Sequence, residues 1–453
     1  MRTSSATRRP RGPQGRPLVG NALQAHGRAL EFMTELAQTY GDVVYYEFLT
    51  EPIYQLTHPD DIESVLVTNN QQFVKSHLTR DVLGPVVGTG LFTSEGTRWR
   101  DQRQLVQPVF EPKEIATYAG LMVECAERSL ETWTDGDRID VHGELLGLTL
   151  DVVARALLGV DIRRDVETIG RNLEVVLGYL GSVEYHVRPE WAPTPGNRRF
   201  KRALAELDAI VDRLITERRS DPDGDDVLSR LLAATDERGE PTSTTQLRNE
   251  VMTFLVAGHE TTALALTYTC YLLSTHPEAE GHLVDELATI LDGRPPSLED
   301  ASDLTYTEQV VTESLRLYPP ASQLHREPLE DVVVGGCRIP AGATVALPQW
   351  VVHRDPRWYP DPLAFRPERW TDEFRAELPR FAYFPFGGGP RRCIADRFAL
   401  LEATLVLATI FQRYHLELRP ETTFAVESSV TTRPKHPVWM TVHERTREQN
   451  PAS

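Results

Sequence analysis

The sequence predicts a mainly α-helical protein with a minor β region, folded as one large domain. Apolar residues recur at helical spacing over several long segments, whereas strand-like runs are short and scattered. No long Pro/Gly/Ser linker, repeat or low-complexity tract divides the 453 residues, so one domain is favoured over the two or three that length alone suggests. Flexible tails are expected at about residues 1–12 and 445–453.

The individual elements follow from these two periodicities. Helices are expected in five segments with an apolar residue every three or four positions: 114–132, 142–159, 165–181, 198–219 and 396–414. Strands are expected in short apolar runs at Val43–Phe48, Val332–Val334 and Thr344–Leu347. Because the helical segments are much longer than these runs, the β part is expected to be minor.

A longer helix is predicted between Ser243 and Pro277. Ser243 can cap its start, with Gln246 three residues on completing a capping box, and Pro277 ends it after roughly thirty residues. Its centre reads Ala257-Gly258-His259-Glu260-Thr261-Thr262 between two apolar flanks, so the helix is expected to be buried. A mid-helix glycine costs about 1 kcal/mol, and a buried glutamate costs more unless it is paired. The cluster therefore indicates either a functional site or, in the bland interpretation, a solvated polar kink.

A glycine-rich loop delivers one cysteine to the start of the last long helix. It reads Phe386-Gly387-Gly388-Gly389-Pro390-Arg391-Arg392-Cys393-Ile394-Ala395. A thiolate is favoured at a helix N-terminus and can serve as an axial ligand to haem iron. The glycines allow close approach to a flat macrocycle, and Arg391 can pair with a propionate. The alternative is a Gly-rich turn before a buried structural cysteine.

Three further patterns are weak in isolation. Glu313 and Arg316 are spaced to share a helical face, upstream of a second arginine segment at 365–370. Trp99 and Arg103 are likewise spaced to project from one face of a short helix, and His325 with Arg326 follow a pair of prolines. An exposed ion pair, or an aromatic residue beside a solvated arginine, would explain each pattern without function.

Together these motifs resemble the cytochrome P-450 superfamily, in the family's order and over most of the chain. Phe386, Gly389, Arg391 and Cys393 match its Phe-x-x-Gly-x-Arg-x-Cys pattern, with Ala395 where many members have glycine. The resemblance implies a single cytochrome P-450-type domain with a long central helix. It also implies the following roles: iron ligation by Cys393; proton delivery by Glu260 and Thr261; the floor of the oxygen pocket from Ala257 and Gly258; propionate contacts from Arg391, Trp99, Arg103, His325 and Arg326; and a buried structural triad of Glu313, Arg316 and Arg369.

The activity implied by this resemblance is monooxygenation. Haem b held by the Cys393 thiolate would insert one atom of O2 into a C–H bond of a lipophilic molecule such as a terpenoid or fatty acid. The variable substrate loops of the family fall at Val74–Phe92 and Leu177–Trp191, which carry few charges. The alternatives are a haem-thiolate enzyme that uses peroxide or needs no external electrons, and a non-enzymatic haem sensor or carrier.

Electrons are expected from separate proteins, a ferredoxin- or flavodoxin-type donor and its reductase. After Cys393 only 60 residues remain (453 minus 393), and nothing resembles a flavin or nicotinamide domain. Although the net charge is −18, arginines gather around the cysteine loop at Arg103, Arg391, Arg392 and Arg397, where an acidic donor can be steered.

Composition restricts the remaining possibilities. The net charge of −18 disfavours nucleic acid as a partner, and the scarcity of lysine fits either a high-salt cytoplasm or a GC-rich genome. No apolar run reaches the length of a membrane span or secretory signal, so a cytoplasmic protein without a membrane anchor is expected. The four cysteines are widely spaced, without a Cys-x-x-Cys pair.

Overall fold

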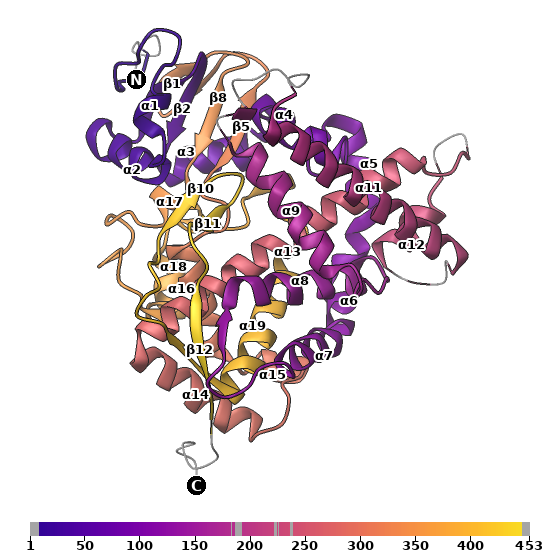
Figure 1. Ribbon diagram of the computed structural model, residues 1–453. Coiled ribbons are helices and arrows are strands. Elements are labelled where there is room, and N and C mark those ends of the chain that lie inside the picture. The colour runs from indigo at the N-terminus through magenta and orange to yellow at the C-terminus, as the bar shows by residue number, and fades with distance from the viewer. Residues whose placement is uncertain are drawn as a thin grey trace.

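The protein consists of a helical body and a smaller β-rich region at one end of it (Figure 1). The computed structural model describes residues 9–182, 184–185, 193–221, 224, 226–235 and 239–445. A mainly α-helical fold with a minor β part is therefore confirmed. No helix in these ranges combines the length and the apolar character that a membrane crossing requires.

Helices account for most of the described chain. In order they are α1 (Ala22–Ala25), α2 (Ala29–Tyr40), α3 (Pro59–Glu63), α4 (His77–Val87), α5 (Gly96–Val106), α6 (Pro112–Thr117), α7 (Ala119–Leu130), α8 (Val141–Leu157), α9 (Val166–Leu180), α11 (Pro195–Ser220), α12 (Val227–Ala233), α13 (Thr244–Thr275), α14 (Pro277–Leu291), α15 (Leu298–Ala301), α16 (Thr305–Leu317), α17 (Gln349–Val352), α18 (Asp372–Glu377) and α19 (Asp396–Arg413). Each of the five predicted helical segments coincides with a helix to within three residues at either end, except that the segment 114–132 is divided at Tyr118, between α6 and α7.

The strands are short, as predicted. They are β1 (Val43–Phe48), β2 (Glu51–Leu56), β3 (Phe73–Lys75), β4 (Arg138–Asp140), β5 (Leu324–Pro328), β6 (Val332–Val334), β7 (Cys337–Ile339), β8 (Thr344–Leu347), β9 (Tyr414–Leu418), β10 (Val426–Ser428), β11 (Thr432–Pro434) and β12 (Trp439–Glu444). The three predicted strands appear with the expected bounds as β1, β6 and β8.

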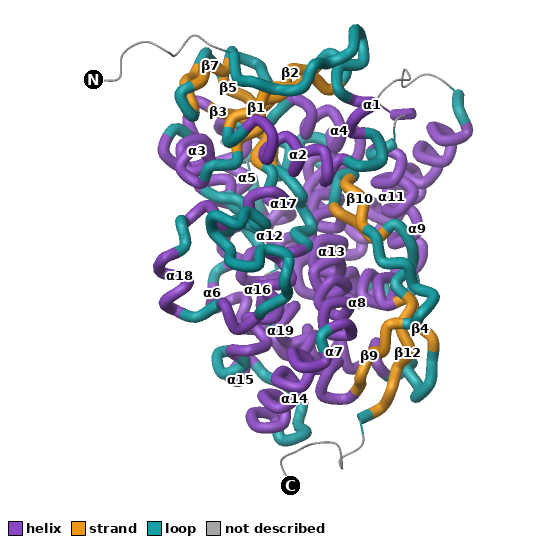
Figure 2. Tube along the Cα trace, turned by 90° about the vertical axis from the view of Figure 1, so that its left-hand side faces the viewer, coloured by secondary structure: helices purple, strands orange, loops and turns teal. Residues whose placement is uncertain are grey.

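The largest sheet joins strands from residues 43–75 with strands from residues 324–347. Its order is β1-β2-β8-β5-β3, with β2 and β8 parallel and the other pairs antiparallel. Figure 2 shows this sheet above the helical body, while the sheet β4-β12-β9 lies against the opposite end. A third pair, β10 and β11, forms an antiparallel hairpin.

Helix α13 is the long central helix that the sequence predicts. The Ser243 hydroxyl accepts a hydrogen bond from the Gln246 backbone N–H at 3.2 Å, and the helix ends at Thr275, two residues before Pro277. The capping box is only half formed, because the Gln246 side chain instead donates to Glu250 Oε1 at 2.6 Å. At 32 residues the helix is about 48 Å long, enough to cross the whole helical body.

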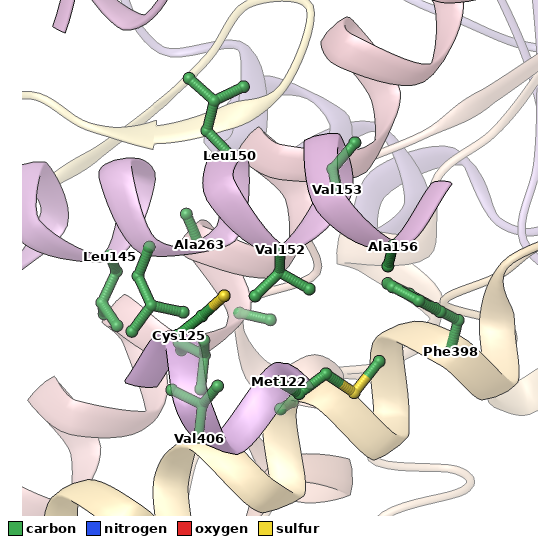
Figure 3. Close-up of a cluster of buried hydrophobic side chains, with 14 of the residues drawn as sticks. Met122, Cys125, Leu145, Leu150, Val152, Val153, Ala156, Ala263, Phe398 and Val406 are labelled. Carbon is green, nitrogen blue, oxygen red and sulfur yellow. The ribbon is translucent and has the colours of Figure 1, made fainter. Parts of the chain in front are cut away.

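The main hydrophobic core lies between α13 and the helices around it. Figure 3 shows Val152 of α8, Met122 of α7 and Val406 of α19 directed toward one another in a buried cluster, to which Ala263 of α13 also belongs. Because these side chains come from four helices, α13 is held on several sides and its centre is fixed in place.

The folded part of the protein extends further toward both ends of the chain than the predicted tails allow. The Arg9 guanidinium lies over the Tyr45 ring at 3.4 Å, and the Arg11 carbonyl accepts a hydrogen bond from the Tyr45 N–H at 3.0 Å, so residues 9–12 run along β1. At the other end Arg445 donates to the Tyr414 carbonyl at 3.2 Å. Residues 1–8 and 446–453 lie outside the described residues, as do residues 183 and 186–191 of the expected substrate segment.

Candidate active site

The cysteine loop is a tight turn that is closed by its own backbone. The Cys393 N–H donates to the Phe386 carbonyl at 2.9 Å, and Gly387 and Gly389 have φ values of +71° and +66°, which favour glycine. A Cβ on Gly389 would lie 1.8 Å from the Leu66 carbonyl oxygen, so this residue must be glycine for a second reason. Ala395, two residues after the cysteine, occupies the capping position of α19.

The thiol of Cys393 is solvent-accessible although dense protein surrounds it. Burial raises its pKa, while the Ala395 N–H, Arg103 and Arg392 act in the opposite direction. The start of α19 thus favours the thiolate as predicted, but burial outweighs that effect. Coordination to a metal cation is what removes the proton from a thiol in such surroundings.

Positive charge accumulates beside the loop. Arg391 forms an ion pair with Glu95 and lies over the Trp99 ring at 4.5 Å, while its Nη1 is buried without a hydrogen-bond acceptor. Burial, followed by the charge of Arg391, lowers the pKa of Arg326 to about 10 and that of Lys75 to about 7.

Other residues expected to bind the cofactor lie next to this group. Arg326 Nη1 donates to the carbonyl of its neighbour His325 at 2.8 Å, and burial lowers the pKa of the His325 imidazole to about 4. Arg103 Nη1 donates to the Arg392 carbonyl at 3.1 Å, which ties α5 to the cysteine loop.

These residues fit an anionic, flat group that carries a metal ion. The unpaired Arg391 Nη1 and the crowded cations call for an anion, the glycines allow close approach of a planar surface, and the accessible sulfur of Cys393 is a soft metal ligand. Haem meets all three requirements, since its propionates, ring and iron match them in turn.

The centre of α13 opens on one face only. Ala257 is exposed and Thr261, one helical turn further on, is half-buried, as is Gly258, while His259, Glu260 and Thr262 are buried. The Thr261 hydroxyl donates to the Ala257 carbonyl at 2.9 Å. Gly258 contacts helix α8 instead: a Cβ at this position would lie 2.8 Å from Val153 Cγ2. Its small size therefore permits the close approach of α8, and its expected place in the floor of the oxygen pocket stays a prediction.

Glu260 is directed away from the open face, toward the β10–β11 hairpin. Its Oε1 lies 2.5 Å from Arg433 Nη2, and the Thr431 hydroxyl also hydrogen-bonds the carboxylate. Burial raises the pKa of Glu260, and Arg433 and Thr431 oppose that shift. The neighbouring His259 hydrogen-bonds the Leu255 carbonyl through Nδ1, a contact within the helix.

The Glu313 triad is assembled behind the loop. Glu313 accepts from Arg316 through two hydrogen bonds of 2.8 Å and from Arg369 Nε at 2.9 Å. Trp370 Nε1 adds a third donor at 2.9 Å, and both Glu313 and Arg316 are fully buried. Arg316 Nη1 also donates to the His353 carbonyl at 2.8 Å, so the network fixes loop backbone as well as side chains.

Comparison with known proteins identifies the family over most of the chain. The family model named Cytochrome P450 matches residues 10–438. The chain belongs to the cytochrome P450 family.

The relatives of this cytochrome P450 include two from Streptomyces. It is 40% identical to cyclooctatin synthase of Streptomyces melanosporofaciens over 93% of this chain and 94% of the relative. It is 36% identical to pentalenene oxygenase of Streptomyces avermitilis, with 90% and 91% covered. The cytochrome P450DA haem domain superposes with a TM-score of 0.88 at 29% identity, covering 97% of this chain and 98% of that one. This cytochrome P450 is accordingly a haem-thiolate monooxygenase.

Sequence reasoning missed three partners at this P450 site. Glu95 pairs with Arg391, Lys75 lies among the same cations, and Arg433 pairs with Glu260. Glu95 lies four residues before Trp99, a spacing that placed it near the motif, but no pattern marked Lys75 or Arg433. Their roles become visible only when distant segments are packed together.

Proposed function

We propose that this cytochrome P450 binds haem b and hydroxylates a terpenoid. The observation that carries the proposal is the cysteine loop: an accessible thiol in a glycine turn, next to an arginine with an unused buried donor. The names of the relatives, which refer to pentalenene and to cyclooctatin chemistry, indicate the substrate class. Accessible apolar residues agree with it, since Phe92 in the expected substrate segment is 43% exposed.

Haem b would be held by residues from three parts of the chain. Cys393 would ligate the iron, with Phe386, Gly389 and Ala395 shaping the loop beneath the ring. Arg391 would direct its free Nη1 to a propionate, where Trp99, Arg103, His325 and Arg326 complete the surroundings. Bound haem supplies the activation of O2 and the oxidation of the C–H bond.

Proton supply is assigned to Glu260 and Thr261. The hydroxyl hydrogen of Thr261 is taken up by the Ala257 carbonyl, so its oxygen lone pairs remain available on the accessible face of α13. Glu260 is a buried carboxyl whose raised pKa suits it to carry a proton. The accessible Ala257 leaves room for a small molecule beside Thr261.

The electron donor is expected to be a ferredoxin- or flavodoxin-type protein that docks beside the cysteine loop. Arg392 and Arg397 are exposed there, on a protein whose net charge is otherwise strongly negative. A cytoplasmic location goes with this proposal, because all four cysteines are unpaired, as in a reducing compartment.

The test is a Soret-band titration of the purified ferric protein with cyclic terpenes, fatty acids and steroids. A high-spin shift is expected with the terpenes, followed by a singly oxygenated product when a ferredoxin and its reductase are added under labelled dioxygen. Incorporation of one labelled oxygen atom would support hydroxylation. A shift with fatty acids alone would overturn the substrate class, and a Cys393→Ser variant that kept the haem-thiolate spectrum would overturn the ligand.

A further inference from the structure

The carboxylate of Glu260 is held by a separate part of the chain, the β10–β11 hairpin. Arg433 Nη2 lies 2.5 Å from Glu260 Oε1, and the side chains are only 14% and 8% exposed, respectively. The contact is an ion pair without hydrogen-bond alignment, because Arg433 Nη2 has no aligned acceptor. Arg433 Nε donates to Thr431 Oγ1 at 3.2 Å, and the Thr431 hydroxyl bonds Glu260. Arg433 and Thr431, which belong to one hairpin, therefore both contact the Glu260 carboxylate.

The two strand ends next to the turn of the hairpin, Ser428 and Thr432, are fixed to the helical body. The Tyr268 hydroxyl of α13 donates to the Thr432 carbonyl at 2.5 Å, and the Thr432 N–H donates to the Pro320 carbonyl at 2.7 Å. Ser428 shares a side-chain hydrogen bond of 2.8 Å with Ser322. These contacts fix the position of Arg433 along the axis of α13, level with Glu260.

The turn of the hairpin reaches the end of α9. A Cβ on Gly181, which follows the last residue of α9, would lie 1.8 Å from the Ser429 hydroxyl oxygen. Gly181 belongs to the segment 177–191, where the substrate loop is expected. One short hairpin thus contacts both this segment and the buried acid.

We propose that Arg433 is a positioning residue for Glu260, and that the β10–β11 hairpin couples proton supply to the conformation of the α9 end. The inference rests on the proposed function, in which Glu260 delivers protons. In this proposal, a shift of the α9 end on substrate binding displaces Ser429 in the hairpin turn and so alters the contacts that Thr431 and Arg433 make with the carboxylate.

The charges around Glu260 make Arg433 the decisive partner. The other groups that face it or Arg433 are Glu174 of α9, Tyr268 and His259 of α13, and His142 of α8. Burial lowers the pKa of both histidines to about 4, so they are neutral near pH 7, and Glu174 and Tyr268 carry no positive charge. Removal of Arg433 therefore leaves the carboxylate without a cation among these groups.

The first test compares Arg433→Gln with Lys435→Gln, which removes the same charge from an exposed position two residues away. In the holoenzyme, product formed per electron pair is expected to fall about tenfold in Arg433→Gln, since an unheld, weaker acid donates its proton poorly. The infrared band of the protonated Glu260 carboxyl is expected to persist to higher pH, and to vanish when Glu260→Gln is added. Lys435→Gln is expected to match the wild type in both.

Equal behaviour of Arg433→Gln and Lys435→Gln would overturn the inference. Glu260→Gln and Thr261→Ala are measured alongside: if these also leave product formation unchanged, the proposed proton pair itself is wrong. If they uncouple the enzyme while Arg433→Gln does not, only the role of Arg433 falls. Should Arg433→Gln fail to fold, Arg433→Lys replaces it. Lysine keeps the charge but lacks the Nε–H that holds Thr431, so a loss of about threefold is expected, and no loss would overturn the inference.

A second test addresses the link to α9. Gly181→Ala introduces a methyl group against Ser429 at a position whose φ of −80° accepts any residue. Product per electron pair is expected to fall about threefold in this variant and to recover when Ser429→Gly makes room, as for directly coupled positions. An unchanged single variant, or a double variant without recovery, would overturn the coupling.

Discussion

Glu313 and Glu260 lie on helices that pack against each other, α16 and α13, and both are buried, but their oxygens are satisfied very differently. Glu313 accepts hydrogen bonds from Arg316, Arg369 and Trp370, and also from the Arg366 N–H at 3.1 Å. Glu260 has one unaligned ion pair and one hydroxyl donor. Burial alone therefore does not distinguish a structural carboxylate from one that can exchange a proton; the number of fixed donors does.

The largest effect on stability is expected from Glu313→Gln, which removes the charge of this carboxylate with little change of shape. Two buried guanidinium groups, those of Arg316 and Arg369, would lose their common anion, and a loss of about 3–5 kcal/mol in the free energy of unfolding is expected. Chemical denaturation of the holoenzyme measures it.

Glu308→Gln on the same helix is the control. Its ion pair with Arg375 is 3.2 Å long and exposed, so a change of at most about 1 kcal/mol is expected. If Glu313→Gln denatured at the same denaturant concentration as this control, the triad would contribute nothing to the fold.

Glu260→Gln is expected to separate activity from stability. Its neighbour Arg433 is not fully buried and can be hydrated, so the free energy of unfolding should fall by less than in Glu313→Gln, by about 1–3 kcal/mol. Coupled product formation is expected to fall about 100-fold, because a general acid is lost. Denaturation and a product assay on the same preparation test both statements. A stability loss as large as that of Glu313→Gln would place Glu260 among the structural carboxylates.

Glu402 of α19 extends the comparison to a carboxyl with no partner. It is fully buried, neither oxygen has a hydrogen-bond partner, and burial raises its pKa well above the ordinary value. Since the folded pKa exceeds the unfolded one, the folded state retains a proton that the unfolded state loses, and Glu402 weakens the fold as pH rises above about 4.5. Its contribution to the slope is at most about 1.4 kcal/mol per pH unit.

The variant Glu402→Gln is expected to remove that slope. Free energies of unfolding measured between pH 5 and pH 8 should therefore diverge from the wild type, with the variant relatively more stable at the higher pH. Parallel curves for the two proteins would show that Glu402 has an unrecognised partner.

The sequence predicted those parts of the site whose geometry is local. The cysteine loop, the i, i+3 pair of Glu313 and Arg316, and both ends of α13 are set by neighbours within a few residues, so motif and spacing were enough. The partners of Glu260 and Arg391 were not predictable in this way. Arg433 and Glu95 meet them through packing of distant segments, 296 residues apart for the Arg391 pair. The packing of Gly258 against Val153 was not predictable for a related reason, because it depends on which face of α13 meets α8.

The cysteine loop rests on segments from the other end of the chain, and this has a consequence for the order of assembly. Gly389 packs against Leu66, and Arg103 donates to the Arg392 carbonyl across 289 residues of sequence. Contacts of such high contact order form slowly, after helices stabilised by local contacts. The ligand for the iron is thus expected to be set in place late in folding, once the β-rich region has docked on the helical body.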